Sequence, residues 1–371
     1  MQAPEPPAPE AIMRHYRRSV AAGFYSNGGP CATLLAERLG EYLGGDTQCV
    51  PVANCTLGLV VALRAACPAP GRRRRLVLCP SYTFTATACA IAAAGLEPAF
   101  VDVERGGWHL DCDSLEHELT RHHGRVAAVL ACATFGTPPP VAHRARWREI
   151  ARRHGVPLVV DAAPGFGAVD EAGTPLGGAG DTEVFSFHAT KPFSIGEGGL
   201  IATGDRSLAR AARRLINFGL RPGSRASDAV GLNAKMSELH AAAALAMLER
   251  IDDVVARRRD NAARLRERIE PLGYRFQVGS ERSTWQILHV QAPTAEVRDR
   301  CVSLAPAHAI ELRTMHEPPL HRQPAFASAD RGPLAVTDAL CARSLALPMA
   351  NRMPEDAFER IPALLEAALS S

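Results

Sequence analysis

The chain has 371 residues, of which 47% are apolar and 22% are charged, and its formal net charge is +3. These are ordinary values for a globular protein, and the length suits a large domain with a smaller one. The slight positive charge gives no reason to expect nucleic acid or a membrane as a partner, and no apolar run reaches membrane-spanning length.

Residues 1–10 are rich in proline and acid, so we expect this segment to be disordered. It lacks the basic and apolar regions of a secretion signal. From residue 11 to 246 the chain alternates short apolar runs with helical patterns. The runs predict strands over 75–79, 98–103, 126–132, 157–161, 183–187 and 199–203. The patterns predict helices over 57–67, 83–95 and 142–154. Continuous apolar strands between helices favour an α/β fold with a mostly parallel sheet covered on both faces.

A single long helix is expected over 237–268, and it would carry the chain out of the large domain. The patterns after it predict strands over 273–278, 285–291 and 310–313, and a last helix over 355–368. The sequence therefore predicts a large domain over 11–246 and a smaller C-terminal α+β domain over 247–371.

Ten cysteines are scattered along the chain without a C-x-x-C pair, and several lie in apolar runs. This usage is typical of small buried side chains in a reducing compartment, so we expect a cytoplasmic protein without disulfides. His122 and His123 have no third ligand at a useful spacing, and we expect no metal site.

Lys191 is the first candidate for chemistry, because it follows an apolar strand and precedes Gly196-Glu197-Gly198-Gly199. The chain holds only two lysines, Lys191 and Lys235. A desolvated lysine has a lowered pKa and can attack an aldehyde to form a Schiff base, which arginine cannot do. A solvent-exposed lysine on a loop fits the pattern equally well.

Asp161 ends the strand expected over 157–161, at the edge where parallel sheets bind ligands. A carboxylate there would pair with a protonated pyridine nitrogen and make the ring an electron sink. A helix cap on the following turn is the alternative. Tyr82 and Phe84 are candidates to stack on a flat ring, although core packing suits one of the two as well.

A phosphate site is indicated by Asn54, Cys55 and Thr56, which precede an expected helix. Free backbone N–H groups and a hydroxyl at a helix start suit a phosphate. Ser186 offers a further hydroxyl to the same group.

Five sequence blocks, in order, resemble the nucleotide-sugar aminotransferases of the DegT/StrS type, which are fold-type-I enzymes that use pyridoxal 5′-phosphate (PLP). The resemblance covers nearly the whole chain. The blocks are YSNGGP at 25–30, PSYTFTAT at 80–87, SFHATK with EGG at 186–199, GLNAKMS at 231–237 and PLHRQPAF at 319–326. The resemblance implies a three-layer, aspartate-aminotransferase-like large domain.

The resemblance also implies residue roles. Lys191 would hold PLP as a Schiff base and then move a proton between substrate and cofactor, while Asp161 would hold the pyridinium. Phe84 would stack on the ring, and Thr56 and Ser186 would bind the phosphate, next to Asn54 and Cys55. Asn233 would reach the phosphate from the partner subunit of a homodimer with shared sites. His321 and Tyr82 are the candidates for contacting the substrate.

Three positions depart from the family pattern. Pro164 stands where the family usually has His or Gln near the phenolic oxygen of the ring, so either another group serves that oxygen or the cofactor is tuned differently. Cys55 replaces a glycine, and Lys235 replaces an arginine. These departures leave Lys191 and Asp161 in place.

The predicted activity is amino transfer from an amino acid, L-glutamate first, to a keto-sugar carried by a nucleoside diphosphate. A keto-cyclitol acceptor is the near alternative. Relatives that dehydrate sugars usually replace the lysine with histidine, so Lys191 argues against that activity. A PLP-binding regulatory protein without turnover is the alternative from another class.

Overall fold

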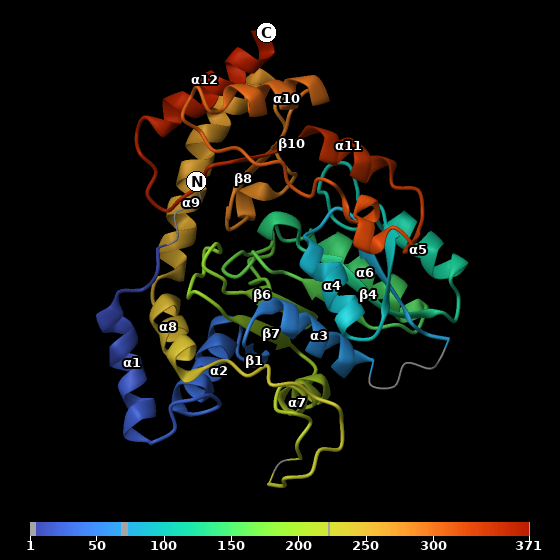
Figure 1. Ribbon diagram of the computed structural model, residues 1–371, viewed down its shortest axis with the longest axis vertical. Helices are drawn as coiled ribbons and strands as arrows, with labels where there is room; N and C mark the ends of the chain where they lie inside the picture. Colours follow the sequence, from blue (N-terminus) through green and yellow to red (C-terminus); the bar gives the residue numbers. More distant parts are fainter. Residues whose placement is uncertain (1–4, 68–72, 222, 371) are drawn as a thin grey trace.

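The computed structural model describes residues 5–67, 73–221 and 223–370 (Figure 1). An eight-stranded sheet lies at its centre, in the order β1-β7-β6-β5-β4-β2-β3-β9. The strands are β1 (Gln48–Val52), β2 (Leu76–Pro80), β3 (Glu97–Val101), β4 (Val126–Cys132), β5 (Leu158–Asp161), β6 (Thr182–Ser186), β7 (Gly199–Thr203) and β9 (Asp330–Arg331). Six of them, β2 to β6 and β9, pair in parallel, and β7 and β1 close one side antiparallel. The prediction of a mostly parallel α/β sheet is confirmed.

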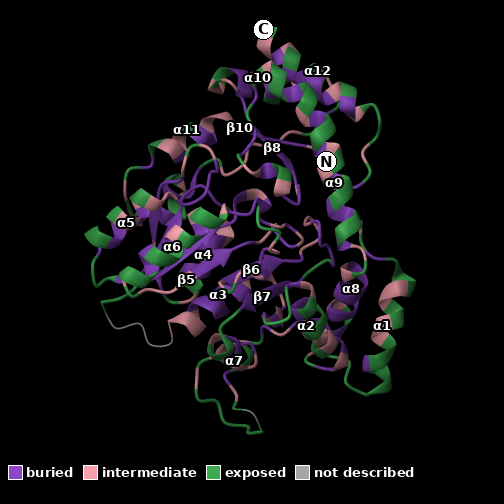
Figure 2. Cartoon of the chain, turned by 180° about the vertical axis from the view of Figure 1, so that it is seen from behind, coloured by how far each residue is buried: buried purple, intermediate pink, exposed green. Residues whose placement is uncertain are grey.

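Helices cover both faces of this sheet, because its central strands are buried on both sides. Neighbouring residues of β6 show this: Val184 packs in the cluster that holds α3, whereas Phe185 packs in the cluster that holds α2 and α8. Figure 2 shows the sheet buried and the outer helix faces exposed. The helices of this part are α1 (Pro9–Ala21), α2 (Pro30–Tyr42), α3 (Cys55–Ala66), α4 (Thr85–Ala93), α5 (Cys112–Arg121), α6 (Val141–Arg153), α7 (Arg206–Leu215) and α8 (Glu238–Leu248).

A second, smaller core lies around a two-stranded antiparallel sheet of β8 (Leu288–Gln291) and β10 (Ser344–Leu347). The helices of this part are α9 (Ile251–Ile269), α10 (Ala295–Leu304), α11 (Ala335–Arg343) and α12 (Ala357–Ser370). Figure 1 shows α9 running from beside α8 to the end of the molecule that carries α10 and α12. The first turns of α9 pack in the cluster of α2 and α8, and its last turns pack in the smaller core. The predicted domain boundary at residue 246 stays a prediction.

The single helix expected over 237–268 is wrong, because the chain breaks between α8 and α9. Arg250 leaves the helical conformation, with φ −127° and ψ −7°, and α9 begins at the next residue. The strands expected over 273–278 and 310–313 are reduced to isolated bridges from Arg275 to Gln291 and from Arg313 to Ala346. β8 starts only at Leu288, because Trp285 has a left-handed backbone with φ 52°.

The disorder expected over residues 1–10 is wrong where the structure describes that segment; residues 1–4 lie outside the described part. Pro9 begins α1, where a proline suits the first helical turn. Glu5 contacts Arg250 and accepts a hydrogen bond from Asn351 at 2.7 Å, which anchors the chain ahead of the helix.

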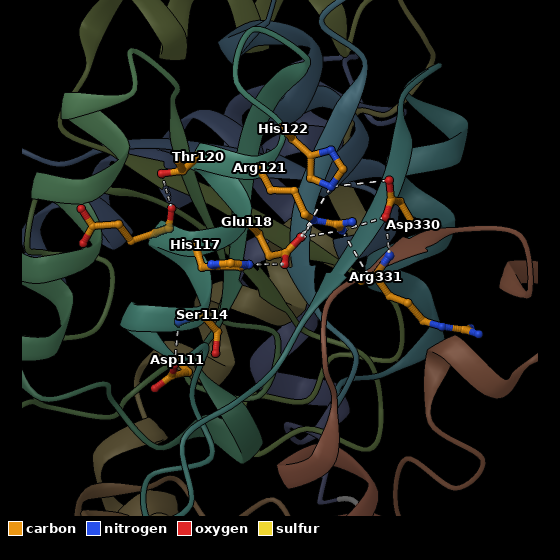
Figure 3. Close-up of polar contacts among 10 residues, drawn as sticks. Asp111, Ser114, His117, Glu118, Thr120, Arg121, His122, Asp330 and Arg331 are labelled. Carbon is orange, nitrogen blue, oxygen red and sulfur yellow. Dashed lines mark hydrogen bonds and ion pairs between the residues drawn. The ribbon is translucent and has the colours of Figure 1, made fainter.

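The short edge strand β9 is held to α5 by a cluster of charged side chains (Figure 3). Arg121 donates to Glu118 at 2.7 Å and to Asp330 at 2.8 Å. His122 lies 3.5 Å from both carboxylates and is buried. Arg331 donates to the carbonyl of His321 at 3.0 Å, so the same anchor fixes the segment that precedes β9.

Among the described residues, no helix combines the length and the apolar character that a membrane crossing needs.

Candidate active site

A cavity of about 880 Å³ lies at the carboxyl ends of β2, β4, β5 and β6. The loops after these strands form its floor, and the first turn of α3 forms one wall. Segments 286–287, 311–316 and 346–348 of the C-terminal part close the opposite side. The cavity therefore lies at the edge of a parallel sheet where ligands commonly bind.

Lys191 lies in this cavity rather than on a solvent-exposed loop. Its loop is fixed by backbone bonds from Lys191 to His188 and from Ala189 to Gly196, where φ is 94°. Nζ donates to Oε1 of Gln286 at 3.1 Å. Burial lowers the pKa of the Lys191 amine, and the nearby Cys55 and Asp161 oppose this shift. A buried amine with a lowered pKa is the state that can react with an aldehyde.

Asp161 is buried at the end of β5 and lines the same cavity. Thr87 donates to Oδ2 at 2.8 Å, and the backbone N–H of Ala163 donates to Oδ1 at 3.1 Å. Burial raises the pKa of Asp161, whereas the bonds from Thr87 and Ala163 and the charge of Lys191 lower it. The residues that follow form turns, so the helix-cap alternative for Asp161 is wrong. Sequence reasoning missed Thr87, whose hydrogen bond to Asp161 joins α4 to the end of β5.

The expected phosphate site lies at the first turn of α3. Asn54 caps the helix by accepting from the N–H of Leu57 at 2.9 Å, so its side chain serves the helix itself. Cys55 and Thr56 occupy the first helical positions and line the cavity together with Ser186. The first N–H groups of a helix lack intrahelical partners and attract anions.

Close backbone approach shapes this helix start. A Cβ on Gly199 would lie 2.8 Å from the nitrogen of Cys55, so β7 can approach the start of α3 only without a side chain there.

Of the two aromatic candidates, Phe84 lies at the cavity with 66% of its surface exposed. Tyr82 is fully buried, and its hydroxyl lies 3.3 Å from Nε2 of His289 and 3.4 Å from Oγ of Ser344. Core packing therefore explains Tyr82, which contributes to the cavity wall, whereas Phe84 presents an open ring face.

Two expected site residues lie outside the cavity of this chain. Asn233 is exposed and pairs with Asn217 in a loop ahead of α8. His321 is not among the residues that line the cavity, and its expected approach to the substrate stays a prediction. His321 lies behind the cavity wall, where Nδ1 is 2.8 Å from Oγ of Ser81 and Nε2 is 3.2 Å from Asp338. The anchored segment before β9 holds it there.

The C-terminal part contributes cavity residues that sequence reasoning missed. His316 stacks on Phe135 with ring centroids 5.0 Å apart, and His289 stacks on the same ring at 3.8 Å. Burial, with a smaller contribution from Lys191, lowers the pKa of His316 to about 3. The backbones of Phe135 and His316 are left-handed, with φ 55° and 58°, a strain that is frequent at functional sites. Neither segment carries a periodic pattern that would have revealed it.

The residues present fit PLP. The buried Asp161 carboxylate calls for a cationic partner, which a pyridinium supplies. The start of α3 suits the phosphate, and Lys191 suits the aldehyde. Pro164 lines the cavity without a side-chain donor, and its carbonyl accepts from Thr284 at 2.6 Å.

Fold and cavity together define an aminotransferase of the PLP-dependent type, and comparison with known proteins specifies the family. The chain belongs to the DegT/DnrJ/EryC1/StrS aminotransferase family, whose model matches residues 8–366. It is therefore a PLP-dependent transaminase of the sugar-aminotransferase family.

Individual relatives match two thirds of the chain or more. Protein Rv3402c of Mycobacterium tuberculosis H37Rv is 34% identical over 369 residues, which are 98% of this chain and 89% of the relative. L-glutamine:scyllo-inosose aminotransferase of Streptomyces griseus is 31% identical over 67% of this chain and 59% of its own length. The crystal structure of DesI, solved with its TDP-sugar product, is 33% identical with a TM-score of 0.87, covering 98% of this chain and 91% of DesI.

Proposed function

We propose that this enzyme transfers an amino group from L-glutamate to a keto-sugar carried by a nucleoside diphosphate. The observation that carries the proposal is the placement of Lys191 and Asp161 in one cavity of about 880 Å³. Its size leaves room for a sugar beside a cofactor. The likeness to DesI, whose structure holds a TDP-sugar product, supports the nucleotide-linked acceptor.

Each part of the cavity has a proposed task. When bound, PLP supplies an electron sink that stabilises a carbanion at the carbon bearing the amino group. Asp161, held by Thr87 and Ala163, would supply the negative charge that pairs with the pyridine nitrogen. The first turn of α3 and Ser186 would bind the phosphate, and Phe84 would stack on the ring. Lys191 anchors the cofactor, and its Nζ then holds and releases the proton that moves during transfer.

The test is the visible absorption spectrum of the purified protein with PLP, before and after L-glutamate is added. We expect a visible band that disappears with L-glutamate as 2-oxoglutarate forms. In Lys191→Ala we expect neither the band nor the formation of 2-oxoglutarate. Lys235→Ala is the matched control, because Lys235 contacts Asn217 outside the cavity and should keep the band. Full turnover in Lys191→Ala would refute the proposed role of the lysine.

A keto-cyclitol acceptor is the second candidate, because the scyllo-inosose aminotransferase of Streptomyces griseus is among the relatives. Its name also makes L-glutamine an alternative donor. Parallel assays with scyllo-inosose and with nucleotide-linked keto-sugars, each with both donors, separate these activities. A regulatory protein without turnover is not proposed, because the family model that matches the chain describes aminotransferases.

We also propose a homodimer with shared sites. Asn233 is exposed outside its own cavity, and Phe218, Val230 and Leu239 expose apolar surface around the same loop and the start of α8. Light scattering should give twice the 39.6 kDa of one chain. Mixing inactive Lys191→Ala with impaired Asn233→Ala should restore activity, since one site of the mixed dimer is intact; a lack of recovery would count against shared sites.

The ten free cysteines support a reducing, cytoplasmic location.

A further inference from the structure

Gln286 is the side chain that holds the amine of Lys191. Its Oε1 accepts a hydrogen bond from Nζ at 3.1 Å, and both residues line the cavity. Gln286 comes from the C-terminal part of the chain, two residues ahead of β8, whereas Lys191 belongs to the loop between β6 and β7. The contact therefore joins the two parts of the molecule at the cavity.

The segment that carries Gln286 is fixed by two sets of hydrogen bonds. Arg258 of α9, only 4% exposed, donates to the carbonyl of Trp285 at 2.8 Å and lies 3.4 Å from that of Gln286. Thr284, two residues before Gln286, donates to the carbonyl of Pro164 at 2.6 Å. The left-handed backbone of Trp285 lies between these anchors. Such over-determined backbone positions a side chain closely.

The chemistry of a carboxamide suits this position. It has an acceptor for the ammonium form of Lys191 and two N–H donors for a neighbouring oxygen, but it carries no charge. A carboxylate at the same place would strongly favour the protonated amine, whereas a carboxamide orients the amine and leaves it able to lose its proton.

We propose that Gln286 is a positioning residue for Lys191: its carboxamide directs the amine within the cavity without placing a charge beside it. The inference rests on the proposed function in one respect, namely that Lys191 is the residue that anchors the cofactor. Burial lowers the pKa of Lys191, and the uncharged acceptor of Gln286 opposes this shift less than a carboxylate would.

The experiment measures the reactivity of Lys191 itself in the full chain freed of cofactor. Trace acetic anhydride labels neutral amines, and mass spectrometry compares the peptides of Lys191 and Lys235 at pH 8. Because the chain has no other lysine, Lys235 is an internal standard within each molecule. Gln286→Glu and Gln286→Leu are compared with Gln48→Glu, which introduces the same charge at the start of β1, the end of the strand away from α3.

In Gln286→Glu, the labelling of Lys191 relative to Lys235 should fall roughly tenfold or more, because an adjacent carboxylate stabilises the ammonium form. In Gln286→Leu the ratio should rise at least about twofold, since the ammonium form loses its acceptor. Gln48→Glu should leave the ratio unchanged. If Gln286→Glu does not fold, as judged by circular dichroism, Gln286→Leu alone decides the matter.

The second readout is the rate at which the visible band of added PLP forms, which should be slower in Gln286→Leu than in the unmodified protein. An unchanged labelling ratio in the folded Gln286 variants would overturn the proposal, even if the band forms normally. By contrast, an unmodified protein that gives no band with PLP would overturn the proposed role of Lys191. The two failures are therefore distinguishable.

Discussion

Replacing Thr87 by valine tests how the Asp161 carboxylate is maintained. The change keeps the shape of the side chain and removes the hydroxyl that donates to Oδ2 at 2.8 Å, and both residues are buried. Losing a hydrogen bond to a buried charged group costs about 1.5–3 kcal/mol. At roughly 2.1 cal/mol/K of unfolding entropy per residue, that loss lowers the Tm of a chain of this length by about 2–4 °C.

The assay is thermal unfolding of the cofactor-free protein, followed by circular dichroism. Thr83→Val is the matched control, because Oγ1 of Thr83 contacts Oγ1 of Thr87 at 3.0 Å and Sγ of Cys132 at 3.2 Å rather than Asp161 itself. The control should lower Tm by less than half as much. Because burial raises the pKa of Asp161, lowering the pH protonates it and should shrink the effect of Thr87→Val. A Tm within 0.5 °C of the unmodified protein, or equal losses in the two variants, would refute this account.

Three further predictions concern the buried residues Gly199, Arg258 and Glu183. Gly199→Ala should weaken PLP binding about tenfold or more in a fluorescence titration, because its Cβ would lie 2.8 Å from the nitrogen of Cys55 at the phosphate site. Arg258→Met should lower the free energy of unfolding by about 2–4 kcal/mol in urea, since it leaves the carbonyl of Trp285 without its buried donor; a loss below 1 kcal/mol would contradict this. Burial, opposed by Arg144, raises the pKa of Glu183 to about 7, so its contribution to stability is present below the unfolded pKa and is lost as pH rises through 7. Glu183→Gln should flatten the fall of Tm between pH 5 and 8, and an unchanged slope would exclude Glu183 as its source.

The sequence predicts most accurately the parts of the fold that are buried on every side. The strands expected over 126–132 and 199–203 coincide with β4 and β7, because each is a continuous apolar run between turns. The positions of Lys191 and Asp161 follow from the same signal, since each residue comes at or soon after the end of such a strand. Strand ends of a parallel sheet meet at one edge, so local patterns placed the two together.

Residues whose position depends on tertiary contacts could not be predicted from the sequence. Gln286 and His316 come from irregular segments whose place is set by contacts with distant loops, such as that of Thr284 with Pro164. No periodicity distinguishes Tyr82 from Phe84, which are two residues apart and differ only in whether the C-terminal part covers them. The break at Arg250 likewise follows from packing of α9 against two cores, which a helical pattern does not record.

The two-residue strand β9 has a consequence for how the chain is made. Its pairing with β3 covers what would otherwise be a free edge of the sheet. The unpaired backbone groups of a free edge can pair with another chain and so lead to aggregation. The anchoring pair Arg121 and Asp330 is 209 residues apart, so during synthesis this edge stays uncovered until most of the chain has left the ribosome. Truncated or slowly translated chains should therefore associate through β3 before their active site has formed.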